Sequence, residues 1–360
     1  MRAYELSQRV GNEQETIVIL WQLCQLHIQQ LRLREALQLA QRSLTLAQVV
    51  QDPVQQIGSW HNMGEAYFWR GDLEQSRPYL ERAFLLCEKV SPDDLIRSFG
   101  SDLWLATAFF LLVTDLIISE SEKTIEWERQ IVRRAAASTH PYSKALGLLF
   151  VQHSAVLRGG DHDLIHVGLN SIRQLCDEYE FPELRGWVEQ FDAYVRFGQG
   201  DAEGALRAMI EAIERLDKVG SLIRRSWRFA ALAQIQHRLG NYDAAEAAVA
   251  MALENIERTG ERWCEPEVYR IAAEITLQES RRDPADSAGQ YLLKALEIAR
   301  VQGARWWELR AATSLARHMA SQGRRHDAYT MLADIYSRFT VVFDSADLKA
   351  AKALLERLRT

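Results

Sequence analysis

Residues 60–83, WHNMGEAYFWRGDLEQSRPYLERA, decide the fold of this chain. Apolar residues recur three and four positions apart on both sides of the dipeptide Gly71-Asp72, a pattern typical of two amphipathic helices joined by a tight turn. Gly64 is small enough to let the neighbouring helix approach, and Gly71 can supply the left-handed turn. Small Ser76 and Ala83 allow the same close approach from the second helix. The stretch therefore predicts a closely packed helical hairpin.

The same frame recurs along the chain, at intervals of 40, 48, 41, 40, 40, 43 and 40 residues. Its spacing resembles the tetratricopeptide motif, whose usual period is about 34, while a period of about 40 to 47 is typical of HEAT repeats, the architectural rival. The Trp/Gly/Tyr spacing and the Gly-Asp turns favour the former. We expect an all-α, right-handed α-α superhelix of about eight tetratricopeptide-like hairpins. The last small or apolar packing position of each repeat, in chain order, is Ser43, Ala83, Ile131, Ile172, Ala212, Ala252, Ala295 and Ile335.

The frame also predicts how the chain is divided. Residues 13–340 hold the eight repeats of about 40 residues, and residues 341–360 form a C-terminal capping helix that begins with Ser345 as N-cap. Residues 1–12 are interpreted as the tail of an upstream helix whose partner is missing. We therefore expect that residue 1 is either a cut inside a longer protein or a reassigned start.

Composition excludes several classes of partner. The formal net charge is −6, which is repulsive toward nucleic acid and anionic lipid. The four cysteines are far apart, as expected for a protein of the reducing cytoplasm. The most apolar segment, residues 103–118, falls short of the roughly 18 residues that a membrane span needs, so a helix buried on several sides is the interpretation.

Three groups of residues were weighed as sites of chemistry. His162 and His166 are four apart, but a third ligand at suitable spacing is missing, so no metal site is expected. His153 replaces the small packing residue of other repeats and is interpreted as a hydrogen-bonded core histidine. The basic pairs are interpreted as solvated helix ends, with an anion-binding stripe as the lesser alternative. These pairs are Arg133-Arg134, Arg224-Arg225, Arg281-Arg282 and Arg324-Arg325.

No catalytic constellation stands out in the sequence. There is no Gly-Lys dipeptide and hence no P-loop, no nucleophile elbow and no His-Glu-x-x-His. We therefore expect a noncatalytic chain without catalytic residues or cofactor, and keep an unrecognised enzyme as a distant alternative.

First helices line the concave face of such a solenoid, so their projecting side chains are the candidate partner or ligand groove. Aromatic anchors in the N-terminal half and arginines in the C-terminal half suit a peptide or an amphipathic ligand. The alternative is that several of the aromatics fill gaps between helices. The candidate residues are Trp21, His61, Glu65, Trp69, Phe150, Trp187, Tyr194, Trp227, His237, Arg270, Arg310 and Arg317.

Longer segments resemble the C-terminal repeat region of large multidomain signalling ATPases. They are residues 258–270, 295–303 with 308–316, and 343–349, with a further likeness in residues 48–53 and 68–71. The resemblance implies an AAA-like, STAND-type ATPase upstream, often preceded by a class III adenylate or guanylate cyclase domain or, in relatives, a DNA-binding regulator. It implies that this chain is a sensing, regulatory or assembly arm.

These observations predict a regulatory binding arm that takes a peptide, or its own upstream ATPase or cyclase domains, on the concave face. The alternative is a sensor in which the superhelix closes on a small-molecule inducer. An aromatic pocket spanning two or three repeats with convergent polar groups favours the sensor, and a continuous open groove favours peptide binding.

Overall fold

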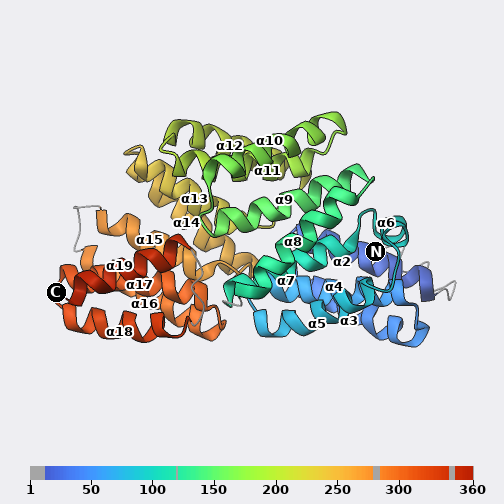
Figure 1. Cartoon of the computed structure of the whole chain (residues 1–360), viewed down its shortest axis with the longest axis horizontal. Helices are drawn as coiled ribbons and strands as arrows, with labels where there is room; N and C mark the ends of the chain where they lie inside the picture. Colours follow the sequence, from blue (N-terminus) through green and yellow to red (C-terminus); the bar gives the residue numbers. More distant parts are fainter. Residues whose placement is uncertain (1–12, 119–120, 279–283, 340–344, 360) are drawn as a thin grey trace.

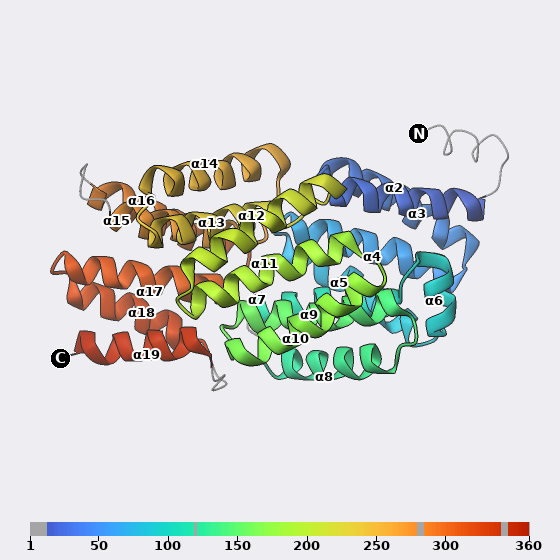
Figure 2. The same ribbon diagram turned by 90° about the horizontal axis from the view of Figure 1, so that it is seen from above.

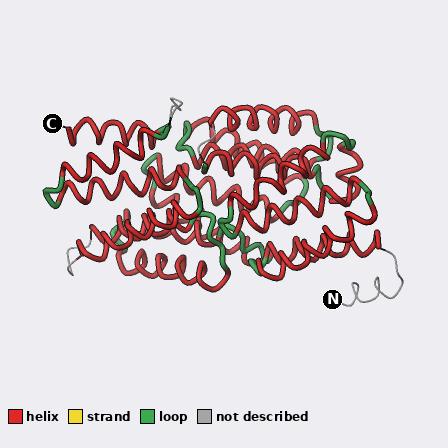
Figure 3. The backbone as a smooth tube through the Cα atoms, turned by 90° about the horizontal axis from the view of Figure 1, so that it is seen from below, coloured by secondary structure: helices red, strands yellow, loops and turns green. Residues whose placement is uncertain are grey.

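The computed structural model describes residues 13–118, 121–278, 284–339 and 345–359. These residues form 18 helices and, within the described ranges, no strand, so the all-α prediction is confirmed (Figure 3). The expected upstream helix tail at 1–12, the Arg281-Arg282 pair and the first two residues of the segment 343–349 lie outside the described residues.

Sixteen of the helices pair as antiparallel hairpins, and consecutive hairpins stack into a solenoid of tetratricopeptide type (Figure 1). The first helix of each hairpin packs on the first helices before and after it, and the second helices lie outside this layer. The pairs are α2 (Glu13–Gln29) with α3 (Leu33–Val50), α4 (Pro53–Trp69) with α5 (Leu73–Cys87), α7 (Leu103–Ile117) with α8 (Ser121–Ala137), α9 (Pro141–Leu157) with α10 (His162–Glu178), α11 (Pro182–Gly198) with α12 (Ala202–Val219), α13 (Arg225–Arg238) with α14 (Tyr242–Thr259), α15 (Glu265–Gln278) with α16 (Pro284–Val301), and α17 (Arg305–Ser321) with α18 (Arg325–Ser337).

Two helices stand outside these pairs. α19 (Ala346–Arg359) packs on α17 and α18 after the last hairpin. α6 (Pro92–Phe99) is an additional helix of 8 residues between α5 and α7, and it accounts for the one interval of 48 residues in a frame of about 40. Ser91 caps it, since the Ser91 hydroxyl accepts the backbone N–H of Asp94 at 3.1 Å.

α7 is the most apolar helix, and 14 of its 15 residues are buried. This confirms the interpretation of the segment as a helix buried on several sides. Of the helices described, none taken singly has the length and apolarity to cross a bilayer; only α6 and α7 together reach that, and they meet at 92°.

The packing within the second hairpin follows the residues that predicted it. A Cβ atom added to Gly64 would lie 2.5 Å from Cγ of Leu80, so only glycine fits there. The Ser76 hydroxyl donates to the Gly64 carbonyl oxygen at 2.7 Å. Gly71 has a φ of +79°, the left-handed conformation that the turn requires.

The solenoid bends until its two halves touch. The backbone N–H of Leu222, between α12 and α13, donates to the carbonyl oxygen of Gln29 at 2.7 Å. The backbone N–H of Arg262, between α14 and α15, donates to the carbonyl oxygen of Trp69 at 2.8 Å. The end of α12 accordingly lies beside the end of α2 (Figure 2), and the turn after α14 lies against the end of α4. Hairpins far apart in the sequence therefore share one interior.

Candidate functional site

Aromatic side chains of the first helices fill much of this interior. Phe68 stacks on Trp263 with ring centroids 5.8 Å apart, although the two belong to opposite halves of the chain. Phe109 stacks on Phe150 at 4.0 Å, and Trp227 meets Trp263 edge-on at 5.6 Å. Such a cluster stabilises the closed curve of the solenoid, because each ring buries a large apolar surface.

Beside this cluster lies a cavity of about 270 Å³. Helices α2, α4, α7, α9 and α11 line it, together with residues 99–101 at the end of α6 and residues 223–224 from the far half of the chain. Half of the residues predicted for the groove line it, and the two halves of the solenoid meet around them. These are Trp21, His61, Glu65, Trp69, Phe150 and Trp187.

The other six predicted residues lie elsewhere. Tyr194 stacks on Trp227 at 4.5 Å, and its hydroxyl donates to the Trp227 carbonyl oxygen, so this pair packs in the core beside the cavity rather than lining it. His237 packs edge-on against Tyr242. The three arginines lie toward the C-terminal end: Arg270 pairs with Glu267 and Glu274, Arg310 pairs with Glu267 and Asp347, and Arg317 is exposed.

One wall of the cavity carries a network centred on Glu65. Its carboxylate accepts from Nε2 of Gln25 at 2.8 Å and from Nε1 of Trp69 at 3.2 Å, and it lies 3.3 Å from Nε2 of His61. Nδ1 of His61 in turn meets the hydroxyl of Thr107 at 2.9 Å. Burial alone would raise the pKa of Glu65, but the hydrogen bonds from His61, Gln25 and Trp69 hold it below its usual value.

Arg224 also lines the cavity, beside Trp69 of this network, and is not among the residues predicted for the groove. The prediction that the Arg224-Arg225 pair is solvated is wrong for Arg224, which is only 2% exposed, whereas Arg225 pairs with Asp217 near the surface. Arg224 adopts a left-handed φ of +64° at the start of α13, which turns its side chain into the molecule. The repeat spacing could have indicated this burial. Arg224 lies 40 residues after Leu184 and 40 residues before Cys264, and both of these equivalent positions are buried.

The guanidinium of Arg224 is held by aromatic faces. Its Cζ lies 4.6 Å from the ring centroid of Trp187 and 5.1 Å from that of Trp69. Its Nε and Nη1 are buried without a hydrogen-bond partner, and the structure shows no carboxylate in ion-pair contact with it among the described residues. Burial lowers the pKa of Arg224 to about 9, so it remains a cation at neutral pH.

The histidines differ partly from their predictions. His153 is buried as expected, but the prediction that it is hydrogen-bonded is wrong, because neither ring nitrogen has a partner. It stacks instead on Phe191 at 5.0 Å and lies close to Trp227. His166 meets Asp192 at 3.1 Å. Across the described parts of the chain, no three His, Cys, Asp or Glu residues are grouped as metal ligands.

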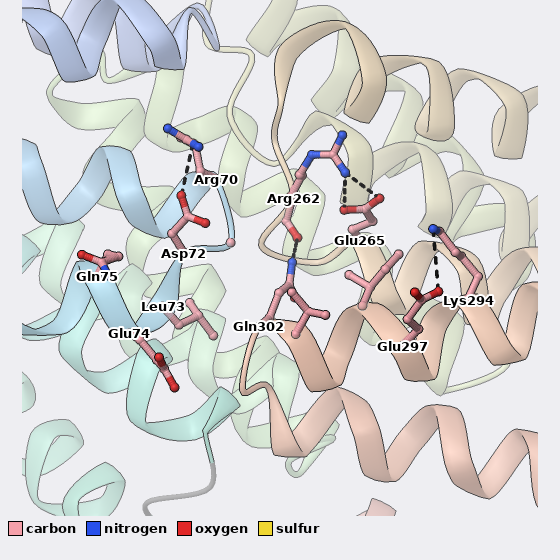
Figure 4. A pocket seen from close by; sticks show the side chains of 13 residues that line it. Arg70, Asp72, Leu73, Glu74, Gln75, Arg262, Glu265, Lys294, Glu297 and Gln302 are labelled. Carbon is pink, nitrogen blue, oxygen red and sulfur yellow. Dashed lines mark hydrogen bonds and ion pairs between the residues drawn. The ribbon is translucent and has the colours of Figure 1, made fainter.

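A second cleft, of about 370 Å³, lies where the turn before α5 faces α15 and α16 (Figure 4). Six of its seven charged side chains, all but that of Glu74, pair with one another. Arg70 meets Asp72 at 3.2 Å, and Arg262 binds both carboxylate oxygens of Glu265 at 3.0 and 2.9 Å. Because these charges already have partners, this cleft has less to offer a ligand than the inner cavity.

Comparison with known proteins agrees with the fold. The tetratricopeptide repeat family matches residues 57–89, which contain the stretch that decided the prediction. The chain carries a tetratricopeptide repeat. No curated protein matches it.

Two solved structures share the fold at low sequence identity. One is a Signal Transduction ATPase with Numerous Domains (STAND) protein with a tetratricopeptide repeat sensor from Pyrococcus horikoshii, with 11% identity and a TM-score of 0.50 over 89% of this chain and 49% of that one. The chain thus spans about half the length of that relative. The other is a Rap protein complexed with competence and sporulation factor, with 13% identity and a TM-score of 0.59 over 96% of this chain and 97% of that one.

Proposed function

We propose that this chain is a noncatalytic regulatory domain that binds an effector in its inner cavity. The observation that carries the proposal is the cavity of about 270 Å³, which is lined by five first helices together with the start of α13. A ligand there would contact several hairpins at once. Its binding would therefore favour one curvature of the solenoid over others, which is how a ligand shifts a conformational equilibrium.

The small volume of the cavity favours a small molecule over a long peptide. Aromatic rings occupy the interior that a peptide groove would need, and the cavity is close to the lower end of the usual range for small-ligand sites, about 300 to 1,000 Å³. Its walls combine aromatic faces with a few placed polar groups, the usual composition of such sites. A peptide, or a segment of an attached domain, remains the second candidate because tetratricopeptide surfaces also serve protein binding.

We propose further that the effector controls an attached signalling domain. The resemblance to repeat arms of STAND-type ATPases, some with cyclase domains, supports this role, as does the sensor named in the Pyrococcus relative. The contact between Trp69 and Arg262 offers a physical route, because it joins a cavity residue to the far half of the solenoid.

The test is to fill the cavity and screen for ligands. Ala106 lines the cavity on α7, so Ala106→Trp would occupy it, whereas Ala247→Trp places the same side chain on the exposed face of α14. A library of metabolites and short peptides is screened by thermal shift. We expect a small molecule to raise the melting temperature of the wild type and of Ala247→Trp but not of folded Ala106→Trp. A hit that protects all three proteins equally would contradict the proposal.

A further inference from the structure

We infer that the ligand of the inner cavity is a small molecule bearing a carboxylate or a similar oxyanion, which binds the guanidinium of Arg224. This inference rests on the proposed function and specifies its ligand class. It follows from a count of which polar groups around the cavity already have partners and which do not.

The unsatisfied groups around the cavity are mainly donors. Nε and Nη1 of Arg224 and the indole N–H groups of Trp21 and Trp187 are buried without acceptors. A buried donor without a partner is costly, so a native structure with four of them beside one cavity indicates that a bound group supplies acceptors. An oxyanion supplies several at once, and a guanidinium binds a planar carboxylate through two parallel hydrogen bonds.

Glu261, Glu183 and Glu65 lie close enough to raise the pKa of Arg224 through space, but none of these carboxylates makes an ion pair or hydrogen bond with its guanidinium. Glu65 is engaged by Gln25, Trp69 and His61. Glu261 binds the backbone N–H of Arg224 and that of Ser226, and thus caps α13 instead of pairing with the guanidinium.

Glu183 also lines the cavity, and its charge raises the pKa of Arg224 through space without ion-pair contact. Its Oε1 is buried without a partner. Among the described residues that line the cavity it is the one side-chain acceptor left without a partner, so a ligand that also carries a hydrogen-bond donor, such as an amine or a hydroxyl group, would use it.

The walls define the rest of the ligand. Trp69 and Trp187 present their faces to the guanidinium and hold it in place. Trp21, Phe150 and Leu146 add apolar surface to the same cavity. We therefore expect the oxyanion to be attached to a compact apolar or aromatic group.

Arg224 is also poorly suited to a purely structural role. It combines a buried, unpaired charge with a left-handed backbone, and both features cost folding free energy. Replacing a buried charge by an apolar side chain of similar length is often neutral or stabilising. If Arg224 serves ligand binding, Arg224→Met should keep or raise the melting temperature of the free protein while it removes anion binding.

The experiment uses isothermal titration calorimetry with phenylacetate, its neutral isostere phenylacetamide, and inorganic phosphate. For the wild type we expect phenylacetate to bind about tenfold or more tightly than phenylacetamide, as one charged hydrogen-bonded contact provides. If phosphate binds as tightly as phenylacetate, the ligand is assigned as a phosphate ester. If phosphate binds more weakly, the ligand is assigned as a carboxylate. Both results support an oxyanion.

Three variants of the chain complete the experiment. Arg224→Met should abolish the preference for the anion, and Arg224→Lys should retain part of it. Arg225→Gln, which removes the pair with Asp217 and the contact with the Phe229 ring, should leave it unchanged. Equal binding of phenylacetate and phenylacetamide by the wild type, blocked by Ala106→Trp, would overturn this inference but leave the proposed function standing. The inference would also be overturned if neither phenylacetate nor phosphate bound at millimolar concentration. It would be overturned as well if Arg224→Met melted at a markedly lower temperature and kept the preference for the anion.

Discussion

The carbonyl oxygen of Trp69 accepts the backbone N–H of Arg262 at 2.8 Å, and this hydrogen bond joins the second hairpin to the turn before α15. Nε2 of Gln302 donates to the Arg262 carbonyl oxygen at 2.9 Å and extends the link to the end of α16. Since Trp69 also lines the inner cavity, the closure of the solenoid and the shape of the cavity depend on the same residue.

This closure should be sensitive to Gly71. A Cβ atom there would lie 3.1 Å from the carbonyl carbon and oxygen of Arg262, in addition to the strain of a left-handed φ. Gly240 has the same φ of +79° at the equivalent turn, but nothing lies within 4 Å of its added Cβ. Both substitutions to alanine should cost about 1 to 2 kcal/mol for the backbone. Only Gly71→Ala should also speed hydrogen exchange at Arg262 and enlarge the radius of gyration in X-ray scattering; equal behaviour would show that the halves close without this contact.

The tight contact between Gly64 and Leu80 gives a second prediction. Gly64→Ala should destabilise the protein by about 1 to 3 kcal/mol, because the new methyl group overlaps Leu80 and its neighbouring backbone. Gly289 lies inside α16, where an added Cβ would be 3.4 Å from the His318 ring, an ordinary contact. Gly289→Ala should therefore be neutral or stabilising through helix propensity. Chemical denaturation measures both, and Gly64→Ala should cost less in a Leu80→Ala background than in the wild type, because the side chain it overlaps is gone.

The local structure could be predicted because its determinants lie close together in the sequence. Gly64, Ser76 and Leu80 belong to one hairpin, so their spacing alone defines the packing of its helices. The left-handed turn at Gly71 follows from the same spacing, since glycine adopts positive φ without steric cost. The interval of 48 residues is longer than the others, but the frame did not predict the additional helix α6 that explains it.

The interior could not be predicted in the same way. Whether an inward-facing side chain meets solvent or another hairpin depends on small rotations that accumulate from repeat to repeat. The frame placed Trp187 and Trp227 on one concave face, but the closed curve puts Trp187 at the cavity and Trp227 in the aromatic cluster. Arg224 was misjudged because a basic pair at a helix end is usually solvated, and only tertiary contact with Trp69 and Trp187 keeps its side chain inside.

His153 should make stability depend on pH. Burial, and secondarily the nearby positive charge of Arg224, lower the pKa of His153 well below 6.5, so the folded protein holds the neutral ring. Below the unfolded value of about 6.5 the unfolded chain binds a proton that the folded chain does not, and stability falls as the pH falls, by up to about 1.4 kcal/mol per pH unit. His153→Phe preserves the stacking on Phe191 and should reduce this loss between pH 6.5 and pH 5. Denaturation curves of both proteins at the two pH values measure it, and parallel losses would show that His153 is not the source.

Trp187 and Trp227 provide the comparison that separates binding from packing. Both indoles are 5% exposed, but Trp187 lines the cavity with an unpartnered N–H, whereas Trp227 packs on Tyr194 and His153 outside it. Phenylalanine at either position keeps an aromatic ring and should cost a similar amount of stability, about 1 to 3 kcal/mol, because each leaves a comparable void. Only Trp187→Phe removes a donor beside Arg224, so only this variant should bind a phenylacetate probe more weakly, as measured by titration calorimetry at a temperature where both are folded. Equal loss of affinity in the two variants would mean that phenylacetate binding depends on the packing of the whole aromatic cluster and not on the N–H donors that line the cavity.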